Sequence, residues 1–240
     1  MSDELAKLLG DRFLERRDVK AVQHSSGIYT PDRTPFSWGD LRAHLEGTKS
    51  FGHYLVSPED KARVFAFDID LVKALPEGHD GPDFSPREHF ANPNSLFRKR
   101  LIVDLMCLAE GLARRTQQLF GIPVAMSFSG TKGVHVYGWT GSENAGEVRG
   151  AAHDVLKSYD EFEAVRGDNF FAHSQYPTCE VEVFPKQSSL EGKDLGNLMR
   201  LALGTNKKSK LRSFFLQPSN VLGEFIEMDP VSALNGKLAW

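Results

Sequence analysis

The order of the secondary-structure signals after residue 63 constrains the fold of this chain most strongly. Apolar residues first follow a strand pattern, then a long helical period, then two short strands joined by GTKG, which is typical of a hairpin. A second helix and a last strand, CEVEVF, follow. This order predicts a four-stranded antiparallel sheet backed by two helices, with an open face suited to a nucleotide or a nucleic acid. The expected elements are strand 63–70, helix 95–120, strands 124–129 and 134–139, helix 144–160 and strand 179–184.

The rest of the chain is expected to flank this core within one domain. A chain of 240 residues buries roughly 70–75% of its unfolded surface, so a substantial core is expected. We expect a single domain over residues 1–240, in which 63–187 form the core. Residues 1–62 then form an N-terminal lobe, and 188–240 complete the domain.

Three local patterns refine the flanking regions. Leucines and Phe13 predict an amphipathic helix over residues 3–20. Ser37 or Asp40 is expected to cap a short helix that ends before Gly47. Residues 76–93 are rich in Pro, Gly and Asp, which predicts an insertion or a mobile lid.

The strand VFAFDIDLV (64–72) ends in two aspartates one residue apart. Side chains alternate along a strand, so Asp68 and Asp70 point to the same side. Two carboxylates about 4–6 Å apart repel each other by about 1 kcal/mol in water and by several times more near a protein surface. A cation between them turns this repulsion into affinity, and hard oxygen ligands suit Mg²⁺ or Mn²⁺. The alternative is a strand end whose aspartates cap a loop or the next helix.

The hairpin sequence SFSGTKGVH brings an anion-binding set of residues together. Two glycines allow backbone amides to turn toward an anion, while a serine hydroxyl, a lysine and a histidine add donors and charge. These are the parts of a triphosphate cradle, although the P-loop pattern is absent. The alternative is an ordinary hairpin with a chance lysine. The residues concerned are Ser129, Gly130, Thr131, Lys132, Gly133 and His135.

The last strand, CEVEVFPKQ, supplies further carboxylates. Alternation places Glu180 and Glu182 on one face, and the order of the elements makes this strand the neighbour of the aspartate strand. A third carboxylate completes a site for two metal ions, which serves in-line phosphoryl transfer to a 3′-hydroxyl. Taken alone, such a strand is usually an exposed face.

Composition excludes some classes of protein. Cys107 and Cys179 form no CxxC pair, which argues against a disulfide framework and a cysteine-built zinc site. No apolar run is long enough for a membrane span and no signal peptide is evident, so we expect a cytoplasmic protein without a membrane partner. The net charge is -3, but TNKKSKLRS (205–213) contains four basic residues and no acidic one. This segment predicts either a local phosphate contact or a solvated loop.

The motifs FDID, SFSGTKGVH and EVFPKQ together resemble those of the archaeo-eukaryotic primase superfamily. The resemblance is strongest to the compact primase-polymerases of phages, plasmids and CRISPR- or transposon-linked conflict systems. It extends to GIYTPDRTPFSWGDLRAHLEGTKSFGHYL and LGNLMRLALGTNKKSKLRSFFL, and so covers residues 27–216. It implies an α+β fold with an RRM-like βαββαβ catalytic core fused to an N-terminal α/β lobe. It also implies a DNA primase-polymerase of a bacterial, phage or plasmid context.

The resemblance assigns roles residue by residue. Asp68, Asp70 and Glu182 match catalytic ligands of two Mg²⁺ or Mn²⁺ ions, although Glu180 could share the role of Glu182. The hairpin residues match the holders of the incoming triphosphate, and Asn197 and Arg200 lie in a segment that approaches nucleotide or template. The implied partners are single-stranded or primed DNA and dNTPs or NTPs. The residues expected to contact DNA are Lys186, Lys207, Lys208, Lys210 and Arg212.

Two departures and the chain end qualify this assignment. RLALG replaces the more usual RLPLG, and SKLRS replaces TGxRS, which leaves the roles of residues 202–212 open. The abrupt end NGKLAW is compatible with one domain of a longer protein that also carries a helicase.

Other functions are compatible with parts of the sequence. A gap-filling repair polymerase of the same superfamily needs the same site. VFAFDIDLV also fits a haloacid-dehalogenase-like phosphatase, in which Asp68 is the nucleophile, but no downstream aspartate pair is found. A single-strand-binding module without catalysis is a third alternative. Four aromatic residues could stack on bases or pack in the core of the N-terminal lobe, namely Tyr29, Trp38, Phe51 and Tyr54.

Overall fold

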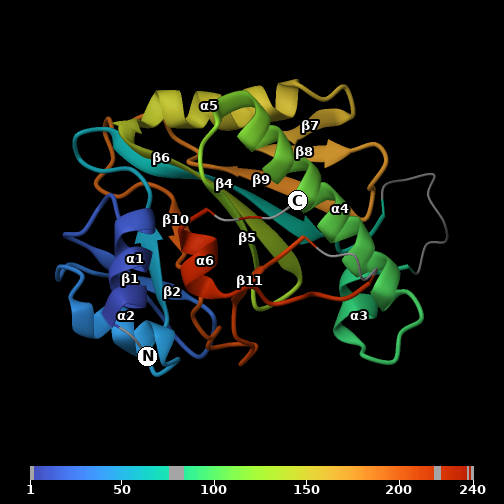
Figure 1. Ribbon diagram of the computed structural model, residues 1–240, viewed down its shortest axis with the longest axis horizontal. Helices are drawn as coiled ribbons and strands as arrows, with labels where there is room; N and C mark the ends of the chain where they lie inside the picture. The colour runs from blue at the N-terminus through green and yellow to red at the C-terminus, as the bar shows by residue number, and fades with distance from the viewer. Residues whose placement is uncertain (1–2, 76–83, 219–222, 237, 239–240) are drawn as a thin grey trace.

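A seven-stranded antiparallel sheet forms the centre of the computed structural model, which describes residues 3–75, 84–218, 223–236 and 238 (Figure 1). The strand order is β11-β5-β6-β4-β9-β8-β7. The predicted four strands lie at its centre, but four strands are too few, because β11 extends one edge and the β7–β8 hairpin extends the other. The strands are β4 (Lys61–Leu71), β5 (Val124–Phe128), β6 (Gly133–Asn144), β7 (Phe162–Arg166), β8 (Phe170–His173), β9 (Cys179–Phe184) and β11 (Phe214–Leu216).

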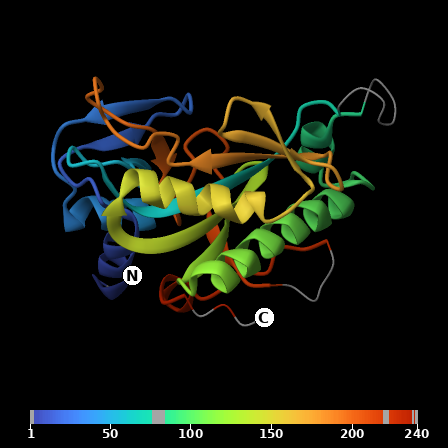
Figure 2. The same cartoon turned by 90° about the horizontal axis from the view of Figure 1, so that it is seen from above.

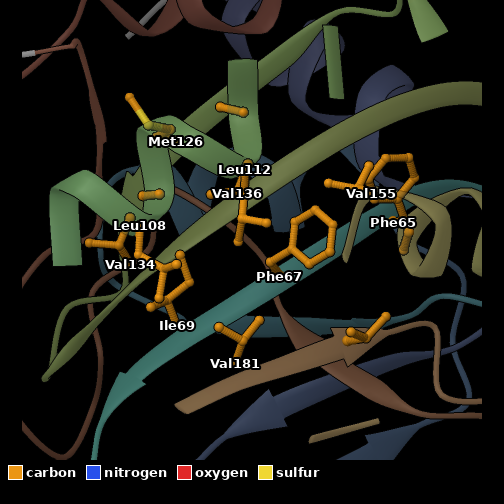
Figure 3. Close-up of a cluster of buried hydrophobic side chains, with 14 of the residues drawn as sticks. Phe65, Phe67, Ile69, Leu108, Leu112, Met126, Val134, Val136, Val155 and Val181 are labelled. Atoms are coloured by element: carbon orange, nitrogen blue, oxygen red, sulfur yellow. The ribbon is translucent and has the colours of Figure 1, made fainter. Parts of the chain in front are cut away.

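Two long helices cover one face of this sheet. The helices α4 (Arg98–Phe120) and α5 (Ala145–Lys157) lie close to the predicted positions and run side by side (Figure 2). Phe65, Phe67 and Ile69 occupy alternate positions of β4, and their side chains all point toward these helices and are fully buried (Figure 3). Burial of each such side chain contributes about 1.5–3 kcal/mol, so this layer fixes the register of β4.

The intervening residues of β4 face the other way. Val64 and Ala66 are buried under the N-terminal lobe, which includes α1 (Asp3–Phe13) and α2 (Trp38–Leu45). Asp68 and Asp70 continue this row of side chains and are only partly buried. The second face of the sheet is therefore partly covered, and β4 emerges from the cover at its two aspartates.

A smaller sheet joins three strands of the N-terminal lobe to one strand that follows the core. Its order is β10-β3-β1-β2, with β1 (Lys20–Gln23), β2 (Tyr29–Asp32), β3 (Phe51–Tyr54) and β10 (Leu198–Arg200). The helix predicted over residues 3–20 is wrong beyond Phe13, because Val19 and Ala21 are buried against Tyr54 and the chain pairs as β1.

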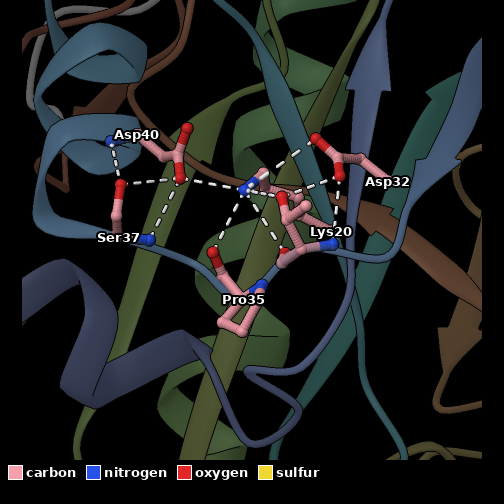
Figure 4. A network of polar contacts seen from close by, with 6 residues as sticks. Lys20, Asp32, Pro35, Ser37 and Asp40 are labelled. Atoms are coloured by element: carbon pink, nitrogen blue, oxygen red, sulfur yellow. Dashed lines mark hydrogen bonds and ion pairs between the residues drawn. The ribbon is translucent and has the colours of Figure 1, made fainter.

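The ammonium group of Lys20 ties the N-terminal lobe together (Figure 4). It donates to the Thr34 hydroxyl at 2.8 Å, to the Pro35 carbonyl at 3.1 Å and to the Asp40 carboxylate at 2.9 Å. Burial acts to raise the pKa of Asp40, but the bonds from Lys20 and Ser37 outweigh it and the pKa is lowered. Ser37 caps α2 in a capping box, as predicted.

The remaining elements correct two expectations. Residues 76–83 of the predicted lid lie outside the described residues, while Pro86–Ala91 form the short helix α3. A haloacid-dehalogenase-like fold needs a doubly wound parallel sheet, whereas β4 is antiparallel to both of its neighbours. The last helix is α6 (Pro230–Leu234). Within the described ranges, no helix has the length and apolarity of a bilayer span.

Candidate active site

The end of β4 lines a pocket of about 220 Å³ between the two sheets. Asp68 and Asp70 enter it from β4, and Arg200 enters it from β10. The predicted hairpin lies on the same side, because Ser129, Thr131 and His135 line the same pocket. The lining is Tyr29, Asp68, Asp70, Ser129, Thr131, His135, Phe184, Leu198, Met199 and Arg200.

A buried polar chain ends at Asp68. The Nε2 atom of His135 lies 3.3 Å from Oδ1 of Asp68, and this buried oxygen accepts no well-formed hydrogen bond from the described residues. On the other side of the ring, Nδ1 lies 2.8 Å from the Tyr137 hydroxyl, which lies 3.1 Å from the Ser127 hydroxyl. With a neutral ring whose Nε2–H faces the carboxylate, Nδ1 accepts from Tyr137. The chain therefore orients His135 toward the pocket.

The turn between β5 and β6 depends on two glycines. Gly130 has a φ of 80°, which an L side chain rarely adopts, and Ser129 Oγ accepts from the amide of Gly133 at 3.2 Å. A Cβ at Gly133 would lie 2.4 Å from both Oδ1 of Asp70 and the Ile69 carbonyl. Only glycine at this position lets the turn lie directly beside the Asp70 carboxylate.

Glu182 lies directly opposite Asp68 in the antiparallel pair of β4 and β9, and Glu180 lies opposite Asp70. Residues paired in this way share a face, so all four carboxylates lie on the same side of the sheet. Lys132 pairs with Asp70, and Lys186 pairs with Glu182. Glu180 instead accepts from Arg166 of β7 at 2.9 Å.

Burial and neighbouring aspartates raise the pKa of two of these carboxylates, while that of Asp68 is lowered. Burial and the charge of Asp68 raise the pKa of Asp70, although Lys132 opposes the shift. Burial raises the pKa of Glu182, as do the charges of Asp68 and Asp70, against the effect of Lys186. Burial also acts to raise the pKa of Asp68, but His135 and more distant cations lower it. The ionised forms of Asp70 and Glu182 are therefore disfavoured, and a neighbouring cation would offset this effect.

Two lysines occupy oxygens of these carboxylates, Lys132 on Asp70 and Lys186 on Glu182. In the described part of the chain, no three His, Cys, Asp or Glu side chains are grouped closely enough to hold one ion. The donor set is nevertheless of the hard oxygen type, and the unbonded Oδ1 of Asp68 faces His135 in the pocket wall. These donors fit Mg²⁺ or Mn²⁺, provided that the side chains of Lys132 and Lys186 move away from them.

Arg200 connects the smaller sheet to the turn. Its Nε donates to the Tyr29 hydroxyl at 3.0 Å, and one terminal nitrogen donates to the Ser129 carbonyl at 2.5 Å. Asn197 does not line the pocket, although its buried Oδ1 has no partner among the described residues. Of the four aromatic candidates, Tyr29 lines the pocket, Phe51 and Tyr54 are buried, and Trp38 is exposed outside the pocket.

The predicted basic segment divides into different environments. Lys207 donates to the Gly47 and Thr48 carbonyls at 2.8 Å each and so holds a loop. Lys210 and Arg212 are exposed. Lys208 is also exposed and lines a neighbouring groove.

The pocket also has apolar walls that sequence reasoning missed. Phe184, Leu198 and Met199 line it, but their types and spacing are the same as those of core residues. Only their place in the fold distinguishes them: Phe184 pairs with Ala66 of β4, whereas Leu198 and Met199 belong to β10 of the smaller sheet.

The comparisons with known proteins cover this whole arrangement. The family model described as TOTE conflict system, Archaeo-Eukaryotic Primase domain, matches residues 11–224. No curated protein matches the chain. The matched range contains every residue that lines the pocket.

Proposed function

The chain belongs to the archaeo-eukaryotic primase domains of TOTE conflict systems, and on this premise we propose that it is a DNA primase-polymerase. The family suggests a primase-like nucleotidyltransferase activity. In our proposal the protein transfers nucleotides from nucleoside triphosphates to a 3′-hydroxyl on a DNA template and releases pyrophosphate.

One observation carries the proposal: acidic side chains of two neighbouring strands share a sheet face with a glycine turn. Asp68 and Asp70 line one pocket with Ser129 and His135, and Glu182 lies opposite Asp68. Phosphoryl transfer needs positive charge at the reacting phosphate and a fixed cradle for the triphosphate tail. Metal ions held by the carboxylates would supply the charge, and the turn would supply the cradle.

The topology supports an RRM-like core for this site. The strands β4, β5, β6 and β9 lie in the order β5-β6-β4-β9, with α4 and α5 on one face. In this order the first and last of the four strands, β4 and β9, are neighbours, which brings the two acidic strands together.

We propose that Asp68, Asp70 and Glu182 hold divalent Mg²⁺ or Mn²⁺. When bound, such ions lower the pKa of the attacking hydroxyl and neutralise charge on the leaving pyrophosphate. Lys132 and Lys186, released from the carboxylates, become available to phosphate oxygens. Glu182 is preferred to Glu180 because it lies directly opposite Asp68 and the charges of both aspartates help to raise its pKa.

The turn is proposed to bind the triphosphate. The Ser129 hydroxyl and His135 Nε2 line the pocket, and Arg200 stands across from them on β10. Their donors converge from three elements, so that a tail bound between them is oriented before the reaction. A gap-filling repair polymerase would use the same residues, and reaction with and without a primer separates the two roles.

The test is extension of a labelled primer on a DNA template, with dNTPs and Mn²⁺ or Mg²⁺. The wild type is expected to extend the primer, and Asp70→Asn to lose about 10²-fold or more of the rate. Glu182→Gln is expected to behave like Asp70→Asn. Glu180→Gln is the matched control, because it removes the same charge from the same strand and face, and it should retain extension.

Three results would contradict the proposal or one of its residue assignments. Extension that survives in Asp70→Asn would separate the activity from this site. Metal-dependent release of phosphate from a simple phosphate ester, without extension, would favour a phosphatase. A reversed pattern for Glu180→Gln and Glu182→Gln would move the third ligand to Glu180.

A further inference from the structure

A second cavity opens beside the pocket and shares Thr131 with it. This cavity, which we call the basic groove, has a volume of about 610 Å³ and is lined by α3, the first turn of α4, the end of β5 and residues 208–211. Thr131 lines both cavities, and the next residue, Lys132, lines the groove and pairs with Asp70. A ligand in the groove therefore approaches the turn that lies beside Asp70.

The groove is strongly cationic. Arg87, Arg98, Lys132 and Lys208 line it, and none of its lining residues in the described part of the chain is acidic. Lys132 pairs with Asp70, but no described carboxylate is within ion-pair distance of the other three. The groove thus carries positive charge that the described part of the protein does not neutralise.

The two arginines are oriented by backbone carbonyls. Arg87 Nε donates to the Leu71 carbonyl at 2.5 Å, and Arg98 Nε donates to the Phe90 carbonyl at 3.1 Å. The Arg98 guanidinium also lies 5.4 Å from the centre of the Phe90 ring. Both side chains are held by one nitrogen, which leaves their terminal nitrogens for another anion.

The remaining lining is apolar. Phe90 and Phe128 lie at the base of the groove, and Leu211 is 50% exposed at its wall. Cations above an aromatic and aliphatic surface suit a ligand with regularly spaced negative charges and flat apolar groups. Single-stranded nucleic acid has this chemistry, whereas a duplex hides its bases from such a surface.

We propose that the basic groove binds a single-stranded segment of DNA next to the nucleotide pocket, with Arg87 and Arg98 on its phosphates. This inference rests on the proposed function for the identity of the strand. It adds the place where the strand binds and the residues that contact it. The three sequence motifs do not contain this information, because Arg87, Phe90 and Arg98 lie outside them.

The test is fluorescence anisotropy of a labelled 12-nucleotide oligothymidine in EDTA, so that binding is read without divalent ions or turnover. The variant is Arg87→Gln with Arg98→Gln. The matched control is Lys61→Gln with Lys157→Gln, which removes the same charge from exposed positions that line neither cavity. Circular dichroism verifies that each variant is folded.

The expected result has three parts. The double arginine variant binds about tenfold more weakly than the control. Its slope of log K against log salt is shallower by about 1.4, because two phosphate contacts on a single strand are lost. An abasic oligomer of the same length binds the wild type at least about fivefold more weakly, because base contacts are lost.

Other outcomes overturn the inference. Equal affinity and slope in the arginine variant and the control would exclude the groove as the strand site, while primer extension that depends on Asp70 would leave the proposed function intact. Equal binding of duplex and single strand would exclude the single-strand specificity. Conversely, loss of strand binding in the arginine variant of a protein that never extends primers would support the groove and contradict the proposed function.

Discussion

At the scale of single residues, the site depends on groups that do not themselves face the pocket. Tyr137 is fully buried, and its ring packs edge-on against Phe13 at 4.8 Å, which links the N-terminal lobe to the sheet. Its hydroxyl lies between Ser127 and His135 Nδ1. Tyr137 is therefore a positioning residue, which determines the ring nitrogen that His135 presents to the pocket.

Substitution Tyr137→Phe tests this role. The ring packing remains, but His135 Nδ1 loses its partner, so we expect the KM for the incoming dNTP to rise about tenfold with a smaller change in kcat. Tyr159→Phe is the matched control, because that hydroxyl donates to the Gly111 carbonyl at 2.9 Å outside the site. Steady-state extension kinetics measure both variants. A wild-type KM in Tyr137→Phe, or an equal rise in Tyr159→Phe, would refute the positioning role.

At the scale of elements, the sequence predicts the parts of the fold in which one strong period runs through a whole segment. The strand at 63–70, both long helices and the strand at 179–184 are all found. The second sheet was missed because its strands are only three or four residues long and pair across distant parts of the chain. The β7–β8 hairpin was also missed, because most of β7 is exposed and shows no alternation.

The candidate site was predictable to the same extent. Motif residues on long strands reveal their face through alternation, so Asp68, Asp70 and Glu182 were placed on one side of the sheet. Their ion pairs depend on the register between strands and on the turn, which no local pattern contains. For this reason the pairing of Lys132 with Asp70, and of Glu180 with Arg166, could only be seen in the structure.

At the scale of the whole molecule, two buried histidines join the smaller sheet to the rest of the fold. His44 accepts from the Phe51 amide at 3.0 Å and contacts the Ala202 carbonyl at 2.9 Å. His53 packs against Phe13, and its ring nitrogens have no hydrogen-bond partner among the described residues. Burial lowers the pKa of His44 to about 4 and that of His53 to about 3.

These shifts predict that the protein loses stability in mild acid. Below pH 6.5 the unfolded chain binds protons at both histidines while the native state does not, so the free energy of unfolding falls as the pH decreases toward 4. Each histidine contributes up to about 1.4 kcal/mol per pH unit in this window. Urea unfolding between pH 7 and pH 4.5 measures the slope.

Variants assign that slope to a residue. His53→Phe should make it shallower, whereas His24→Gln, at an exposed position, should leave it unchanged. A slope in His53→Phe equal to that of the wild type would show that the acid sensitivity has another origin.

The most direct measurement is a crystal structure of the protein with Mn²⁺ and a non-hydrolysable nucleoside triphosphate, in which anomalous scattering locates the ions. We predict manganese peaks in contact with carboxylate oxygens of Asp68, Asp70 and Glu182, with Lys132 and Lys186 turned away from these oxygens. The triphosphate should lie along residues 129–135. Ions bound elsewhere, or a triphosphate on the opposite face of the sheet, would contradict the assignment of this site.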